Sequence, residues 1–342
     1  MSETYLALYR KYRPKTFKHV VGQDHIVTLL ENAIRDKKVS HAYLFCGGRG
    51  TGKTTVARIV AREVGCNDED IIEIDAASNR GIDEIRELRE AVRTAPFSSP
   101  YKVYIIDEAH MLTKEAANAL LKTLEEPPSH VIFILATTDP DKLPQTIVSR
   151  CQKVIFKQPD SKTLKEHLAK VAKEEGYTIP DEGLVLIGIH GKNSYRDALG
   201  LLEQITTINS SSKKVTLESI VDFLGVPEEK VLYRLLISIC KKEASLVTEL
   251  IHILEKKTGA ALITYDELIN LVRAALVSRI GGDTVAPKGI TEEGVREAGV
   301  KYPLIINSRL ILDLLEKRHL LEVSEAHAWI EFEAILLSLI VD

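Results

Sequence analysis

Residues Gly47–Thr54 read Gly-Gly-Arg-Gly-Thr-Gly-Lys-Thr and match the phosphate-binding loop G-x-x-x-x-G-K-[ST] in full. An apolar run, Ala42–Cys46, precedes the loop and is typical of a buried strand, and a helical pattern over Thr55–Val64 follows it. Strand, glycine loop and helix in this order direct backbone N–H groups and a helix N-terminus at a polyphosphate. The sequence therefore predicts a nucleoside triphosphate site, with the Lys53 ammonium on the β- and γ-phosphates and the Thr54 hydroxyl on Mg²⁺.

Further apolar runs alternate with helical patterns in the first part of the chain. The predicted strands are Ile71–Asp75, Val103–Asp107, Val131–Thr137 and Val154–Phe156. This alternation predicts an α/β core in which a mainly parallel sheet carries helices on both faces. Ligands of such sheets bind at the carboxyl ends of the strands, and the phosphate loop and the next two polar motifs all lie at such ends.

The first of these motifs is a pair of adjacent acids. The strand Val103–Asp107 continues into Glu108, Ala109 and His110. The Asp107 carboxylate can complete the Mg²⁺ shell with Thr54, and Glu108 can polarise the attacking water, which are separate tasks in phosphoryl transfer. Alone, this would be an ordinary strand end with solvated carboxylates. Together with the phosphate loop it indicates a nucleotide hydrolase.

The second motif closes the following strand with two threonines. We expect Thr137 to fill space in the sheet, as β-branched residues do. Thr138 stands at the strand end, where its hydroxyl could hydrogen-bond the attacking water or the γ-phosphate. By residue type alone, Arg150 and Arg196 are ordinary surface charges.

Past residue 160 the pattern changes to helical periodicity without a convincing strand, as in Leu164, Leu168 and Val171. Turn signals interrupt it at Ile179–Asp181 and Gly225–Pro227. We therefore predict an α/β core at 1–159, a small helical unit at 160–222 and a larger helical domain at 223–342.

The net charge of −4 means that any nucleic-acid binding must use local basic patches. One such patch lies between Asp83 and Thr94, where Arg86, Arg89 and Arg93 fall at i, i+3 and i+7. An apolar stripe runs beside them, and acidic residues alternate with them. Two interpretations stay open: a solvated face with intrahelical ion pairs, or a surface that contacts the DNA backbone.

Cysteine usage and hydropathy indicate the compartment. Cys46, Cys66, Cys151 and Cys240 show no paired spacing, so we expect reduced cytosolic thiols rather than disulfides or a zinc site. No apolar run has the length of a membrane helix, and the N-terminus lacks the features of a signal peptide. We expect a cytoplasmic protein without a membrane partner.

Taken together, the motifs of this chain resemble a known family, the AAA+ clamp-loader ATPases, and most closely the bacterial gamma/tau subunits of DNA polymerase III. The segments that carry the resemblance span about residues 5–205 in family order; they are Tyr12–Phe17, Val21–Gln23, Gly47–Thr54, Asp75–Gly81, Asp107–Thr113, Leu120–Pro127, Ala136–Pro140, Ser149–Cys151 and Arg196–Leu199. The last 120 or so residues match only in helical character.

The resemblance implies a P-loop AAA+ core with a parallel sheet, a helical lid, and an all-α collar through which subunits assemble into a hetero-pentamer. It implies ATP and Mg²⁺ as cofactors. The assembly would open a ring-shaped sliding clamp and set it on primed DNA for the replicative DNA polymerase, and accessory subunits would reach single-strand-binding protein.

It also implies roles for residues at motif positions. Catalytic roles fall to Lys53, Glu108 as the base, Thr138 as a γ-phosphate sensor, Arg196 on the lid, and Arg150, which would reach the ATP of the neighbouring subunit. Asp107 and Thr54 would bind Mg²⁺. Nucleotide contacts would come from Gly47, Gly48, Arg49, Gly50, Thr51, Gly52, Lys53, Thr54 and Thr55, with an adenine pocket near Tyr12, Arg13, Pro14 and Val21. The family's DNA path falls near Arg80, Arg86 and Thr146, and the basic stripe with Arg89 lies there too.

The chain departs from the family pattern in two places. Bacterial relatives usually insert a four-cysteine zinc module between the first core helix and the second strand. Here that interval is Gly65–Asp70, with one cysteine, so we expect no zinc. The chain also ends where the collar ends, without the long tail by which the tau form holds the polymerase and the helicase, so we expect a gamma-type subunit.

Three other classes stay in view. A helicase, prompted by Asp-Glu-Ala-His at 107–110, would need a second, strand-rich motor domain. A Holliday-junction branch-migration motor of the AAA+ class would need a strand pair of a winged helix after Asp222. A non-hydrolysing structural subunit would be expected to carry a broken phosphate loop, whereas this loop is intact.

Overall fold

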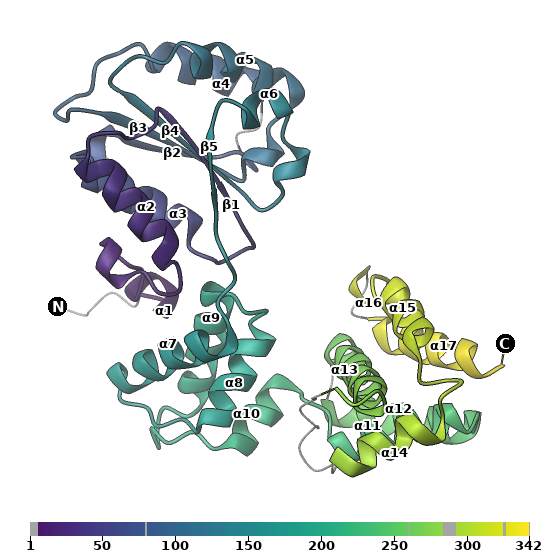
Figure 1. Cartoon of the computed structure of the whole chain (residues 1–342). Helices are drawn as coiled ribbons and strands as arrows, with labels where there is room; N and C mark the ends of the chain where they lie inside the picture. Colours follow the sequence, from purple (N-terminus) through teal and green to yellow (C-terminus); the bar gives the residue numbers. More distant parts are fainter. Residues whose placement is uncertain (1–5, 79–80, 259, 283–291, 324–325, 342) are drawn as a thin grey trace. The chain divides into compact units, whose positions relative to one another are not determined.

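The computed structural model describes residues 6–78, 81–258, 260–282, 292–323 and 326–341. The chain divides into two compact units, 1–217 and 218–342. The first unit holds a five-stranded parallel sheet and the helices around it (Figure 1). Its strands are β1 (Ala42–Cys46), β2 (Ile71–Asp75), β3 (Lys102–Asp107), β4 (Val131–Thr137) and β5 (Gln152–Ile155).

The sheet order is β2-β3-β4-β1-β5, and every pairing is parallel. The α/β prediction is thereby confirmed, and β1, β2 and β4 have the predicted bounds. The last strand is Gln152–Ile155 rather than Val154–Phe156, because its ladder with β1 begins at Gln152 opposite Tyr43. Strand β4 lies between β1 and β3, so its end stands between the phosphate loop and Asp107.

Helices cover both faces of this sheet, which explains why β1 and β4 are buried along their whole length. Alternate strand residues serve two separate cores. Leu44 and Phe133 pack with helices α4 (Ile82–Ala91) and α5 (Lys114–Glu125) on one face. Phe45 and Ile134 pack with α2 (Asp24–Arg35) and α3 (Lys53–Glu63) on the other face. The sheet thus forms a rigid platform for the loops at its carboxyl edge.

The rest of the first unit is helical. Helix α6 (Gln145–Val148) precedes β5, and α7 (Ser161–Glu174), α8 (Asp181–His190) and α9 (Tyr195–Ile208) follow it. The short helix α1 (Leu8–Lys11) packs against α9. Past β5, the described part of this unit adds only an isolated bridge between Thr178 and Lys214.

Helix α10 (Leu217–Leu224) begins at the division between the units. The described residues of the second unit form helices α11 (Glu229–Cys240), α12 (Ala244–Thr258), α13 (Ala261–Arg279), α14 (Glu292–Lys301), α15 (Ser308–Lys317), α16 (Leu320–Val323) and α17 (Ala328–Val341) (Figure 1). One core joins them, around Leu235, Tyr265 and Phe332. The strands that a helicase motor or a winged helix would require are absent from the described residues of this unit.

Buried and paired groups hold the second unit together. The hydroxyl of Tyr265, on α13, donates to the carbonyl of Leu314 at 2.8 Å, and burial raises the pKa of this phenol. Arg318 makes a bidentate pair with Asp266 at 2.6 and 2.7 Å. Planar two-point pairing of this kind fixes orientation as well as charge.

Candidate nucleotide site

The phosphate loop links β1 to α3 in a conformation that needs glycine. Gly52 and Gly50 have φ values of +99° and +68°, which glycine adopts without strain. A Cβ at Gly47 would lie 2.6 Å from the carbonyl oxygen of Phe156. At Gly50 it would lie 1.9 Å from Oγ of Ser194, the residue that caps α9. Helix α3 begins at Lys53, two residues earlier than predicted.

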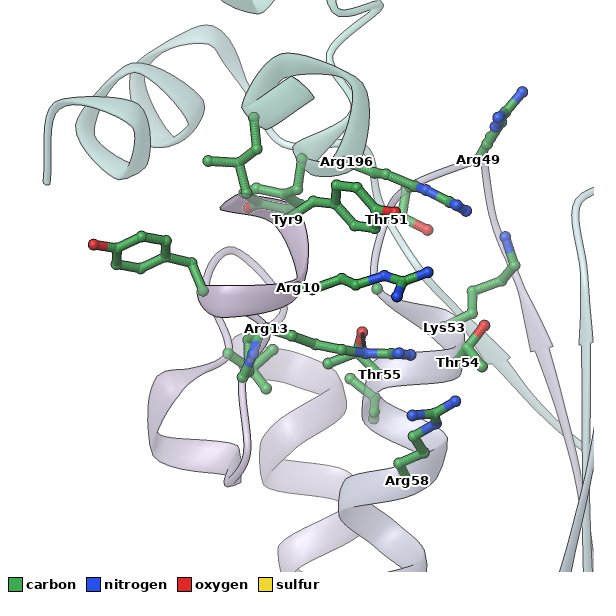
Figure 2. A pocket seen from close by; sticks show the side chains of 18 of the residues that line it. Tyr9, Arg10, Arg13, Arg49, Thr51, Lys53, Thr54, Thr55, Arg58 and Arg196 are labelled. Atoms are coloured by element: carbon green, nitrogen blue, oxygen red, sulfur yellow. Dashed lines mark hydrogen bonds between the residues drawn. The ribbon is translucent and has the colours of Figure 1, made fainter. Parts of the chain in front are cut away.

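A cavity of about 810 Å³ opens beside this loop. It is lined by the loop and α3, by the N-terminal segment around α1, and by residues of α7 and α9 (Figure 2). Predicted nucleotide-contacting residues that line it are Tyr12, Arg13, Pro14, Val21, Arg49, Gly50, Thr51, Gly52, Lys53, Thr54 and Thr55. Asp107, Glu108 and Arg196 line it as well, so the site brings together most of what the sequence predicts.

The charge of this cavity is strongly positive. Its cations are Arg10, Arg13, Arg49, Lys53, Arg58 and Arg196, against the acids Glu73, Asp107 and Glu108. Burial lowers the pKa of Lys53, while Glu108 and Asp107 partly oppose that shift. Burial and the neighbouring Arg58 charge lower the pKa of Arg13. Because cations outnumber acids in the lining and burial desolvates Lys53 and Arg13, the cavity suits a polyanion.

Lys53 is the residue expected to contact the phosphates, and Thr54 is the residue expected to contact magnesium. The buried Lys53 ammonium donates to the carbonyls of Gly47 and Gly48, each at 2.9 Å. The Thr54 hydroxyl donates to Asp107 at 2.6 Å. A hydroxyl and a carboxylate in contact are hard oxygen ligands, and Mg²⁺ takes few of these from the protein beside phosphates and water. These residues therefore fit Mg²⁺ and a triphosphate.

The acid beside Asp107 has an unusual backbone. Glu108 lies in the left-handed region at φ +47°, which costs a residue with a side chain about 1–3 kcal/mol. Strain of this kind clusters at functional sites. The Thr138 hydroxyl donates to Glu108 Oε2 at 3.2 Å, so the predicted sensor and the predicted base are in contact. Thr137 is buried, as expected of a sheet residue, but its hydroxyl also lies 3.0 Å from His110 Nδ1.

The two predicted arginines occupy different surroundings. Arg196, on α9, points into the cavity with its guanidinium 5.2 Å from the centre of the Tyr9 ring (Figure 2). Arg150 follows α6, pairs with Glu125, and donates to the Thr146 carbonyl at 2.7 Å. Among the described residues that line the cavity, Arg150 and Thr138 do not occur.

The predicted DNA-contacting residues are only partly described. Arg80 lies outside the described residues, and so does the side chain of Arg86. Arg89 lies on α4 and Thr146 on α6, and these helices pack on the same face of the sheet. The predicted basic helix face is too long, because α4 ends at Ala91 and Arg93 lies in the turn that follows.

Sequence reasoning missed several residues of the cavity: Tyr9, Arg10, Arg58, Glu73, His167 and Tyr195. Arg58 lies four residues after Thr54, so helical periodicity could have found it on the same side of α3. The others come from distant segments. The N-terminal segment that carries Tyr9 and Arg10 is held by hydrogen bonds, since the Leu8 N–H donates to Glu203 on α9 and Arg13 donates to Thr55 on α3.

Comparisons with known proteins bear on the family and the fold of this chain. A family profile described as "DNA polymerase III, delta subunit" matches residues 22–81 and 68–160. The tau subunit of DNA polymerase III from Bacillus subtilis is 41% identical over 92% of this chain and 60% of the relative. The gamma subunit from Buchnera aphidicola is 38% identical over 70% of this chain and 72% of that relative.

This chain belongs to the gamma/tau subunit family of DNA polymerase III. It spans 60% of the Bacillus subtilis relative and 36% of the tau/gamma subunit of Haemophilus influenzae. The Holliday junction branch migration motor RuvB of Thermotoga maritima superposes with a TM-score of 0.53 at 23% identity, over 67% of this chain and 79% of that one. At that identity the likeness shows the fold alone, a P-loop ATPase core with helices after it.

Potential metal ligands are scattered over the described residues of this gamma/tau family chain. No group of three or more His, Cys, Asp or Glu side chains among them could hold a metal ion. Burial raises the pKa of Cys66 to about 11 and that of Cys151 to about 12, whereas zinc needs the thiolate. That the chain binds no zinc stays a prediction, which elemental analysis of the purified protein would check.

Within the described residues, no helix is both apolar and long enough to span a bilayer.

Proposed function

We propose that this chain is an ATP-dependent motor subunit of a clamp loader, which opens a sliding clamp and loads it on primed DNA. Membership of the gamma/tau family supports this proposal. The observation that carries it is the contact of Thr54 with Asp107 and of Thr138 with Glu108 beside a positively charged cavity. The residues that we assign to binding and to hydrolysis lie at one edge of the sheet.

Each residue has a task in this proposal. Bound Mg²⁺ would neutralise phosphate charge, and Thr54 and Asp107 would hold it. The Lys53 ammonium and the loop N–H groups bind the phosphates. Glu108 accepts the proton of the attacking water, and Thr138 holds the Glu108 carboxylate from the end of β4. Arg196 reaches the same nucleotide from α9, and Tyr12, Arg13, Pro14 and Val21 enclose the base.

The domains and partners follow the same proposal. We assign the core to 1–159, the lid to 160–222 and the collar to 223–342. The collar would join this chain to other clamp-loader subunits in a hetero-pentamer. Its exposed apolar residues support such an interface; they include Leu304, Leu312, Leu315 and Ile330. The sliding clamp and primed DNA are the substrates of the assembly, and single-strand-binding protein would be reached through accessory subunits.

The test is the ATPase rate of the reconstituted complex with and without primed DNA and a sliding clamp. We expect the two together to stimulate hydrolysis, and fluorescent clamp to be transferred to DNA only with ATP. Lys53→Ala is the control, because it removes the loop's ammonium and should abolish productive ATP binding. Hydrolysis that ignores both clamp and primed DNA would contradict clamp loading.

The DNA path gives a separate prediction. Arg86→Glu combined with Arg89→Glu should weaken stimulation by primed DNA and flatten its salt dependence, because each lost phosphate contact removes about one released counterion. Stimulation is measured across a salt titration. The matched control is Arg35→Glu with Lys38→Glu, an equal charge change at exposed residues at the end of α2, on the other face of the sheet. If both pairs behave alike, the α4 face is an ordinary solvated surface.

A further inference from the structure

One oxygen of the Glu108 carboxylate faces two side chains. Thr138 donates its hydroxyl to Oε2 at 3.2 Å, and His110 Nδ1 lies 3.5 Å from the same oxygen. His110 Nδ1 also lies 3.0 Å from Thr137 Oγ1, and that hydroxyl accepts the backbone N–H of Asp139 at 3.0 Å. The imidazole therefore stands between the predicted base and the strand β4.

These contacts differ in energy according to whether Nδ1 of the imidazole carries a proton. An unprotonated Nδ1 would turn its lone pair toward the Glu108 carboxylate, which is electrostatically unfavourable. A protonated Nδ1 can donate to Thr137 Oγ1 and attract the Glu108 oxygen at the same time. The contacts therefore favour a proton on Nδ1.

The residues around His110 restrict its position, so that it can hold the Glu108 side chain relative to strand β4. His110 is only 11% exposed at its side chain and belongs to the single turn Ala109–Met111 directly after Glu108. Thr137 is fully buried in β4, which lies in the middle of the sheet. Glu108, in contrast, sits at a left-handed residue outside any strand or helix. Without His110, the hydrogen bond from Thr138 would have to orient the Glu108 carboxylate by itself.

We propose that His110 is a positioning residue for Glu108, which holds the carboxylate in the direction required to take a proton from water. This inference rests on the proposed ATPase function. A general base contributes about 10²–10⁴ in rate, and misplacing a reacting group by about 1 Å can forfeit about 10². His110 is not among the described residues that line the nucleotide cavity, so its effect falls on hydrolysis and not on ATP binding.

The test compares His110→Ala with His110→Asn in the complex assembled with clamp and primed DNA. The asparagine amide nitrogen takes the place of Nδ1, so this variant should keep kcat within about threefold, whereas alanine should lower kcat by about 10- to 100-fold. The Kd for an ATP analogue should change by less than about twofold in both. Equal losses in the two variants, or a loss confined to ATP affinity, would overturn the proposal.

A second comparison separates positioning from folding. In a Glu108→Gln background, His110→Ala should cause no further loss in single-turnover rate, because the group that it positions is gone. An additive loss there overturns the inference. If the alanine variant does not fold, His110→Gln takes its place. The glutamine amide lies one atom further from the backbone than Nδ1, so it cannot replace that nitrogen. The proposal then requires the asparagine variant to be more active than the glutamine variant. A wild-type complex that never hydrolyses ATP overturns the proposed function, whereas equal wild-type and variant rates overturn only the role of His110.

Discussion

An Arg150→Ala chain is expected to bind ATP normally while hydrolysis fails at the site of the neighbouring subunit. Arginines supplied across an interface are worth about 10³–10⁵ in rate, because they stabilise charge on the transferring phosphoryl group. Arg150 suits this task, since it lies away from the lining of its own cavity and is held by Glu125 and the Thr146 carbonyl. If a step controlled by DNA and clamp limits the ATPase rate, the measured loss in the Arg150→Ala chain would be smaller than this factor.

Mixing two inactive chains tests this prediction. An Arg150→Ala chain keeps its phosphate loop, and a Lys53→Ala chain keeps its arginine, so a mixed oligomer can form complete sites. ATPase activity rescued by mixing supports a shared site, and Arg62→Ala, which removes an arginine on α3 that pairs with Asp68, serves as the control. No rescue, with equal losses in monomer and oligomer, would mean that Arg150 acts within its own chain or only stabilises the fold.

Replacing Glu108 by glutamine should trap ATP. Binding persists because Thr54, Asp107 and Lys53 are untouched, whereas the loss of the base lowers hydrolysis by about 10²–10⁴. The measurement is retention of labelled ATP on the protein through gel filtration, together with the single-turnover rate. Glu63→Gln, at the exposed end of α3, is the isosteric control. Wild-type turnover by the Glu108 variant would show that another group is the base.

Much of the fold was predictable because its signals are local. The buried strands β1 and β4 are uninterrupted apolar runs, and their bounds match the sequence prediction. The phosphate loop, Asp107 and Thr138 lie at strand ends, and a parallel sheet brings such ends together. Arg93 was misplaced because a stripe of charges does not reveal where α4 ends.

The missed residues depend on contacts across the chain. Tyr9 reaches Arg196 only because α1 packs on α9, and the two residues are nearly two hundred positions apart in sequence. His110 belongs to the Asp-Glu-Ala-His motif at 107–110, but Thr137, which lies beside it in space, belongs to the next strand. Their contact could therefore not be predicted from sequence spacing. Helical and strand periodicity give the face of each element, whereas partners between elements come from packing.

Gly50 occupies one of the four positions that the phosphate-loop motif leaves open to any residue. Its left-handed φ demands glycine there, and so does the lack of clearance to Ser194, because a Cβ at this position would lie 1.9 Å from Ser194 Oγ. Ser194 caps the helix that carries Arg196, so this clearance sets how closely the arginine's helix can approach the loop. Two different constraints therefore act on the sequence of this loop. Binding of phosphates requires the motif residues, and the packing of a helix about 140 residues later in the same chain requires glycine at position 50.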